Sequence, residues 1–113
     1  MDLTIIKHAV EADDGIKRLS MAFVKKHAAP DRTRLSAELC TDITKELDKL
    51  GLVTLPKRLP RSENEFIFVI KKESPLGHVV AVAGSLAALD EVGANPLPRI
   101  FENYPQAKAQ LVS

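Results

Sequence analysis

The feature that most constrains the fold is a stripe of large aliphatic residues that ends at a glycine. The stripe recurs at the three- and four-residue spacing of one helix face and consists of Leu35, Leu39, Ile43, Leu47 and Leu50. Gly51 follows it directly, and glycine is the residue that most often ends a helix. We therefore predict a helix that begins at about Arg32 or Thr33, ends at Leu50 and buries this face in the core.

Two strand-like segments follow this helix, and a polar turn separates them. Residues 52–55 and 65–72 are dominated by aliphatic, β-branched and aromatic side chains, which favour strands. Residues 56–64 contain two prolines, an asparagine and three basic residues, a composition typical of a turn. We expect these segments to form an antiparallel hairpin with a basic loop.

Both faces of the second strand are apolar. Phe66, Phe68 and Ile70 alternate with Ile67 and Val69, and successive side chains of a strand point to opposite faces. Another element must therefore cover the hairpin. The predicted core joins the aliphatic stripe to three aromatic side chains and comprises Leu35, Leu39, Ile43, Leu47, Phe23, Phe66 and Phe68.

The chain before the stripe predicts two helical segments. Leu3, Ile6 and Val10 have helical spacing, although Ile5 is out of phase and leaves a short strand as the alternative. We expect Asp14 to cap a second helix. The buried side of that helix would carry Ile16, Leu19, Phe23 and Val24, and its outer side Lys17, Arg18, Lys25 and Lys26.

The chain after the hairpin predicts the covering element. Ser74 followed by Pro75 has the form of a helix N-cap and first turn, and apolar residues then recur with helical spacing to Leu89. We expect a helix here. The β-branched residues within 78–83 leave a third strand as the alternative.

The length of 113 residues is sufficient for one core and predicts a single domain, 1–113. We expect an α+β, winged-helix-like fold of about four helices packed on one antiparallel β-hairpin. Its parts are an N-terminal segment (1–14), a helix-helix-hairpin core (15–72), an Ala-rich covering helix (73–93) and a C-terminal extension (94–113) with a helical turn around Ile100 and Phe101.

The order of elements between Asp42 and Ile70 resembles the second half of winged helix-turn-helix DNA-binding domains. A helix ends in Leu50-Gly-Leu-Val53 and leads through a short strand and a basic loop into the apolar run that begins at Phe66. In that family the helix enters a groove of the DNA and the loop is the wing. The resemblance implies a small, non-enzymatic DNA-binding regulatory protein.

The basic residues are unevenly distributed along the chain. The formal charge is +1 in total, yet residues 1–14 carry −3, residues 15–34 carry +5 and residues 56–61 carry +3. Clustered cations attract phosphate groups. The predicted nucleic-acid-binding residues are Lys25, Arg32, Arg34, Lys45, Lys57, Arg58 and Arg61, and Thr41 is a further candidate for a groove contact.

Two observations oppose DNA binding. The predicted helix carries a net charge of −2 between Leu35 and Leu50, which repels phosphate, and its stripe runs without the interruption of a helix-turn-helix. A protein–protein interaction adaptor or inhibitor that binds no nucleic acid is therefore the alternative, and an enzyme is the third. We expect a homodimer, because Gly77 to Leu89 and the Ile100-Phe101 pair offer more apolar surface than a thin hairpin covers.

Residues that could perform catalysis or bind a metal are scattered. His8, His27 and His78 lie in separate segments and predict no zinc site, and the glycines form no phosphate loop, so no cofactor is expected. Cys40 lies beside the aliphatic stripe, where we expect a buried, unreactive thiol. The sequence shows no secretory signal and no uncharged run of membrane-spanning length, so we expect a cytoplasmic protein with no membrane partner.

Overall fold

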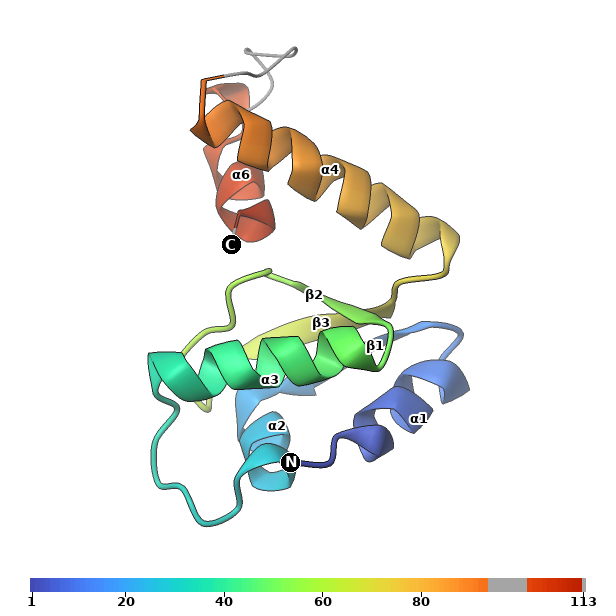
Figure 1. The fold of residues 1–113 in the computed structure, drawn as a ribbon, viewed down its shortest axis with the longest axis vertical. Coiled ribbons are helices and arrows are strands. Elements are labelled where there is room, and N and C mark those ends of the chain that lie inside the picture. Colours follow the sequence, from blue (N-terminus) through green and yellow to red (C-terminus); the bar gives the residue numbers. More distant parts are fainter. Residues whose placement is uncertain (94–101, 113) are drawn as a thin grey trace.

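The computed structural model describes residues 1–93 and 102–112, which form an α+β fold with a three-stranded antiparallel sheet (Figure 1). The helices are α1 (Thr4–Ala12), α2 (Met21–Ala28), α3 (Ala37–Lys49), α4 (Pro75–Glu91) and α6 (Pro105–Leu111). The strands are β1 (Ile16–Ser20), β2 (Leu52–Leu55) and β3 (Phe66–Lys71), in the order β1-β3-β2. The predicted α+β class and the predicted hairpin are confirmed, and the sheet has a third strand that the sequence analysis did not predict.

The helix α3 is the element predicted best from the sequence. Leu39, Ile43 and Leu47 lie on one face of it and are buried, as the stripe predicts. The helix begins at Ala37, later than expected, because the Ser36 hydroxyl caps it by accepting a hydrogen bond from the Leu39 amide at 3.0 Å. Gly51 follows the C-cap with φ +75°, the left-handed conformation that glycine adopts without strain.

The strand β1 corrects the prediction of a helix capped by Asp14. Residues Ile16–Ser20 pair antiparallel with β3, with Arg18 opposite Phe68. This pairing satisfies the backbone groups on the edge of β3 that β2 leaves open, a gain that outweighs the helical spacing of the apolar residues. The helix α2 therefore begins only at Met21, and the Ser20 hydroxyl caps it by accepting from the Phe23 amide at 3.1 Å.

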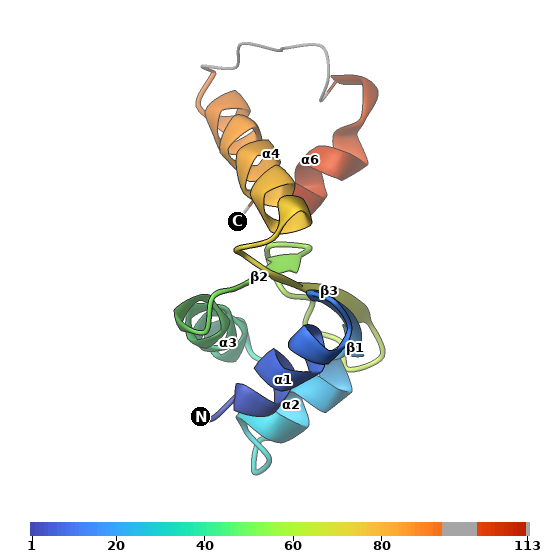
Figure 2. The same ribbon diagram turned by 90° about the vertical axis from the view of Figure 1, so that its right-hand side faces the viewer.

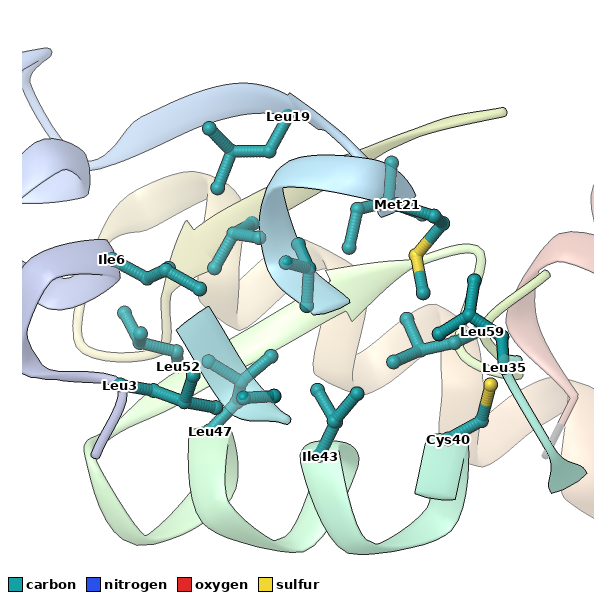
Figure 3. Close-up of a cluster of buried hydrophobic side chains, with 14 of the residues drawn as sticks. Leu3, Ile6, Leu19, Met21, Leu35, Cys40, Ile43, Leu47, Leu52 and Leu59 are labelled. Carbon is teal, nitrogen blue, oxygen red and sulfur yellow. The ribbon is translucent and has the colours of Figure 1, made fainter. Parts of the chain in front are cut away.

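The core lies on one side of the sheet, beneath α1, α2 and α3 (Figures 1 and 2). Ile67 and Val69 of β3 point to this side and are fully buried. They belong to a buried cluster, shown in Figure 3, that also includes Leu3, Ile6, Leu19, Met21, Leu35, Ile43, Leu47, Leu52 and Leu59. The predicted burial of the aliphatic stripe is confirmed, and Phe23 packs half-buried at the edge of this cluster.

The predicted burial of Phe66 and Phe68 is wrong. These side chains point to the outer face of the sheet and are 49% and 41% exposed. The alternation along β3 separates two apolar faces but does not decide which one the helices cover, and α1, α2 and α3 all pack on the other face. The Arg18 guanidinium lies 3.8 Å from the centre of the Phe66 ring, an arrangement of the cation–π type.

The helix α4 lies on the outer side of the sheet and covers only one end of it (Figure 2). Ile70, at the end of β3 where α4 begins, is buried, whereas Phe66 and Phe68 at the other end are not. The helix is confirmed and the alternative of a strand at 78–83 is wrong. Within the described residues no helix combines the length and apolar character needed to cross a membrane.

The C-terminal helix α6 packs against α4 and reaches back to the hairpin loop. The Lys57 amide donates a hydrogen bond to the Gln110 carbonyl at 2.8 Å, and Lys108 forms an ion pair with Asp90 of α4. Hydrogen bonding to Asp90 is the main cause of the raised pKa of Lys108. The helical turn predicted around Ile100 and Phe101 lies outside the described residues.

Truncation of the stripe tests the core. Leu39→Ala or Ile43→Ala should lower the free energy of unfolding by about 2–5 kcal/mol, because each leaves a cavity between α3 and the sheet. Phe68→Ala is the matched control on the outer face and should cost clearly less, about 1 kcal/mol. Urea denaturation midpoints measure the loss of stability in each variant. A loss for Phe68→Ala as large as that for the two α3 variants would contradict the outward orientation of Phe68.

The junction between β3 and α4 depends on Gly77. A Cβ atom at this position would lie 2.5 Å from the Lys72 carbonyl oxygen, which is backbone and cannot move aside cheaply. Gly77→Ala should therefore lower the stability by about 1–3 kcal/mol. Gly84→Ala is the control in the same helix. A Cβ atom at position 84 would have the Leu111 carbonyl oxygen as its nearest neighbour, at an ordinary contact distance of 3.7 Å. This variant should therefore be as stable as the wild type, or more stable by up to about 1 kcal/mol because alanine favours the helix.

Candidate nucleic-acid interface

A basic hollow lies between α3 and the loop 56–65 that joins β2 to β3. Its volume is about 620 Å³, and its lining comes from one side of α3 and from the loop. The lining residues are Ala37, Cys40, Thr41, Thr44, Lys45, Lys57, Arg58, Leu59 and Arg61. Four of these side chains are cations and none is an acid, so the hollow has the charge that attracts phosphate.

The packing of α3 decides which of its residues face this hollow. Because Leu39, Ile43 and Leu47 fix one face against the core, the residues at helical spacing from Ala37, namely Thr41 and Thr44, turn toward the loop. The acids of α3 are absent from the lining of the hollow, although Asp48 lies on the same side of the helix as Thr41 and Thr44, one turn beyond Thr44. The lining of the hollow itself therefore carries no negative charge.

Ion pairs engage two of these acids. Asp48 pairs with Lys72 beyond the end of β3, and Glu46 lies 3.7 Å from Lys49 on the same helix. In each pair the negative charge of the carboxylate is balanced by a lysine that does not line the hollow. The charges of Asp48 and Glu46 are thus balanced by neighbouring cations.

The loop 56–65 is held in place at several points. Leu59 is buried beneath it, and the Arg61 Nε donates a hydrogen bond to the Leu35 carbonyl at 3.4 Å. At the far end of the loop the carbonyls of Glu63 and Glu65 accept hydrogen bonds from the first amides of α2 at 3.1 and 2.8 Å. These contacts hold the loop against α2 and the segment before α3, and they anchor the Arg61 side chain directly.

A second hollow of about 500 Å³ continues this surface toward the segment that joins α2 to α3. Thr33, Arg34, Leu35, Arg61 and Glu63 line it. Arg61 lines both hollows, so the structure brings the predicted residues Arg34, Arg58 and Arg61 onto one continuous surface together with Lys45 and Lys57.

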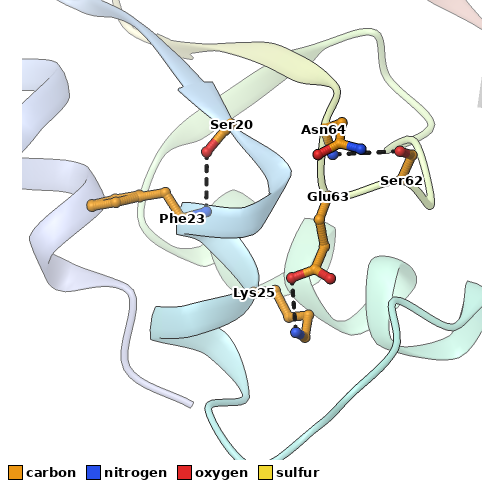
Figure 4. A network of polar contacts seen from close by, with 6 residues as sticks. All are labelled: Ser20, Phe23, Lys25, Ser62, Glu63 and Asn64. Carbon is orange, nitrogen blue, oxygen red and sulfur yellow. Dashed lines mark hydrogen bonds and ion pairs between the residues drawn. The ribbon is translucent and has the colours of Figure 1, made fainter.

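Lys25 and Arg32, which the sequence also suggested, have different settings. Lys25 pairs with Glu63 at 2.9 Å, and its side chain is only 14% exposed (Figure 4). Its charge is thus balanced within the protein, and it holds the end of the basic loop against α2. Arg32 is exposed between α2 and α3 and lines neither hollow.

Cys40 lies at the floor of the first hollow. Its thiol is buried, and its Sγ lies 3.8 Å from the Pro60 carbonyl oxygen. Burial raises the pKa of this thiol, and the nearby Arg61 opposes the rise to a smaller extent. The thiol is therefore protonated at neutral pH, which disfavours a role as nucleophile.

Thr44 and Ala37 are interface candidates that the sequence analysis did not select. Both share a helix face with Thr41, and their spacing of three and four residues from it would have identified them once the loop was placed on that side.

Within residues 1–93 and 102–112 no group of three or more histidine, cysteine, aspartate or glutamate side chains is placed to hold a metal ion. Comparison with family models, curated proteins and solved structures finds no match for this chain.

Proposed function

We propose that this chain is a small winged-helix-like DNA-binding regulatory protein. In this proposal α3 enters a groove of duplex DNA and the loop 56–65 acts as a wing that contacts the phosphates. The observation that carries the proposal is the hollow between them, which four cations and no acid line.

The arrangement of elements supports this proposal. The helices α2 and α3 are separate and joined by residues 29–36, so a two-helix unit precedes the hairpin, although α3 itself runs without interruption from Ala37 to Lys49. The strand β1 completes a sheet from which the loop between β2 and β3 extends beside α3. A helix of ordinary diameter fits the major groove of DNA, and a basic loop at its side reaches the backbone.

Each residue of the hollow then has a stated role. Lys57, Arg58 and Arg61 contact phosphate oxygens, which fixes the position of the protein on the duplex without reading its sequence. Thr41, Thr44 and Lys45 lie on the side of α3 that faces the loop, where their hydroxyl and ammonium groups reach base edges. Arg34 extends the phosphate contacts from the second hollow.

One observation favours the alternative of an adaptor that binds protein. The helix α4 exposes large apolar side chains, among them Val79 and Val82 at 63% and 62%, and such surfaces mark protein contacts. This surface lies on the side of the sheet away from α3, so a protein contact there leaves the basic hollow open.

Replacement of Arg58 and Arg61 by alanine tests the DNA-binding proposal. The double variant should bind every duplex sequence more weakly, and the dependence of log affinity on log salt should fall by up to about two, roughly one per lost phosphate contact. Fluorescence anisotropy with a mixed-sequence duplex at low and moderate salt measures both quantities. Because Arg61 also bonds the Leu35 carbonyl, thermal unfolding must show that the variant remains folded.

A matched control removes two cations from outside the hollow. Lys7→Ala combined with Lys26→Ala lowers the net charge equally but changes neither α3 nor the loop. The control should retain most of the affinity and salt dependence of the wild type. Equal losses in both double variants would indicate nonspecific attraction, and a wild type without salt-dependent binding at low ionic strength would exclude the proposal.

A further inference from the structure

The helix α4 is apolar on all sides, and much of it has no cover within the described residues. A helix of this kind is normally buried, because it has no polar face to present to water. Its described contacts are with β3 at its start and with α6, and it projects from the sheet in both views (Figures 1 and 2). Val79, Val82, Leu89 and Val92 along it are all more than 40% exposed.

The projection of α4 also affects the size of the molecule. The radius of gyration is 14.5 Å, whereas a compact domain of this length has a value of about 13 Å. The excess agrees with a helical arm that extends from an otherwise packed body. The projection of α4 is therefore visible in the size of the molecule as well as in the exposure of its single side chains.

The exposed side of α4 has the repeat of a helix–helix contact. His78, Val82, Ser85, Leu89 and Val92 succeed one another at spacings of four, three, four and three residues, and all are exposed. This is the heptad spacing by which two helices pack along one another. We call these five residues the α4 seam.

The opposite side of α4 is already occupied. Ala87 is buried there, and Val80, Ala83 and Gly84 are partly buried on the side that faces α6 and the sheet. The seam and the contact with α6 thus use different sides of the helix. A partner on the seam displaces none of the contacts of α4 with β3 and α6 that the structure describes.

We propose that the α4 seam binds the same seam of a second copy of this chain, with the two helices antiparallel about a two-fold axis near Ser85. Ser85 is the middle residue of the seam, so this axis places Val82 of each copy near Leu89 of the other and His78 near Val92. The contact is self-complementary, as a two-fold interface requires. The small side chains at the centre, those of Ala81, Ser85 and Ala88, allow the two helices to approach closely.

The charge of α4 favours a second copy over an unrelated partner. Between Pro75 and Leu89 the helix has no lysine, arginine, aspartate or glutamate, and His78 is its one titratable side chain. A partner must therefore be equally apolar to cover it without burying unpaired charge. The chain's own α4 is such a surface, and the antiparallel arrangement keeps Asp90 and Glu91 of each copy at the two ends of the contact.

The area of this contact predicts a weak dimer. A specific interface buries at least about 1,000 Å² in total. A valine or leucine contributes roughly 60–120 Å² when it is fully buried. The six valine and leucine side chains of two seams therefore supply roughly 360–720 Å², and the histidines and small residues must supply the rest. The dimer should therefore exchange with monomer at accessible protein concentrations.

This proposal is independent of DNA binding, although the two are compatible. The basic hollow lies on the α3 side of the sheet and the seam on the outer side. A dimer through α4 therefore carries two basic hollows.

Sedimentation velocity over a wide range of protein concentration tests the proposal without DNA. The wild type should shift from a particle of 12.4 kDa toward twice that mass as the concentration rises. Val82→Glu places a charge in the seam and should remain monomeric throughout. Ala22→Glu adds the same charge at an exposed position of α2 and should dimerise like the wild type. A wild type that stays monomeric, or a Val82→Glu variant that dimerises normally, would overturn the proposal.

A cross-link tests the position of the two-fold axis. Ser85→Cys should form an intermolecular disulfide under mild oxidation, because residues next to the axis lie within the reach of a disulfide in the dimer. Cys40 is buried, so the unmodified chain is the control and should not cross-link. Ser62→Cys introduces an exposed thiol in the basic loop and should also remain unlinked. A dimer that links through position 62 and not through position 85 would exclude the antiparallel seam.

Discussion

The contact between the aliphatic face of α3 and the inner face of the sheet is the constraint on which the other features depend. Leu39, Ile43 and Leu47 belong to one buried cluster with Ile67 and Val69. This packing fixes how α3 is rotated about its axis. It thereby determines that Thr41, Thr44 and Lys45 face the basic loop, so the positive lining of the hollow is a consequence of core packing.

The sequence predicts the elements whose signals are local. The stripe of α3, the glycine after it, the basic turn and the capped start of α4 each depend on residues within one or two turns of the chain. The strand β1 was missed because Ile16 and Leu19 are also compatible with a helix, and their extended conformation depends on pairing with β3 about fifty residues later. The orientation of Phe66 and Phe68 was missed for a related reason: two apolar faces alternate along β3, and only the packing of three helices selects the inner one.

The candidate interface could be predicted in part. Charge clustering along the sequence identified Lys57, Arg58 and Arg61, and the resemblance to a recognition helix identified Lys45; all four line one hollow. The same clustering could not show that Glu63 balances Lys25, or that Lys17 and Arg18 lie on a strand, since both depend on contacts between distant segments.

The most direct measurement of the central claim is a map of amide chemical shifts in the ¹⁵N-labelled protein as mixed-sequence duplex DNA is added at low ionic strength. We expect the largest changes at Thr41, Thr44 and Lys45 of α3 and at residues 57–61 of the loop, and we expect them to reverse when salt is added. Signals along the exposed side of α4 should change little. Spectra that stay unchanged, or changes confined to α4 and the outer face of the sheet, would contradict the assignment of the basic hollow as the nucleic-acid interface.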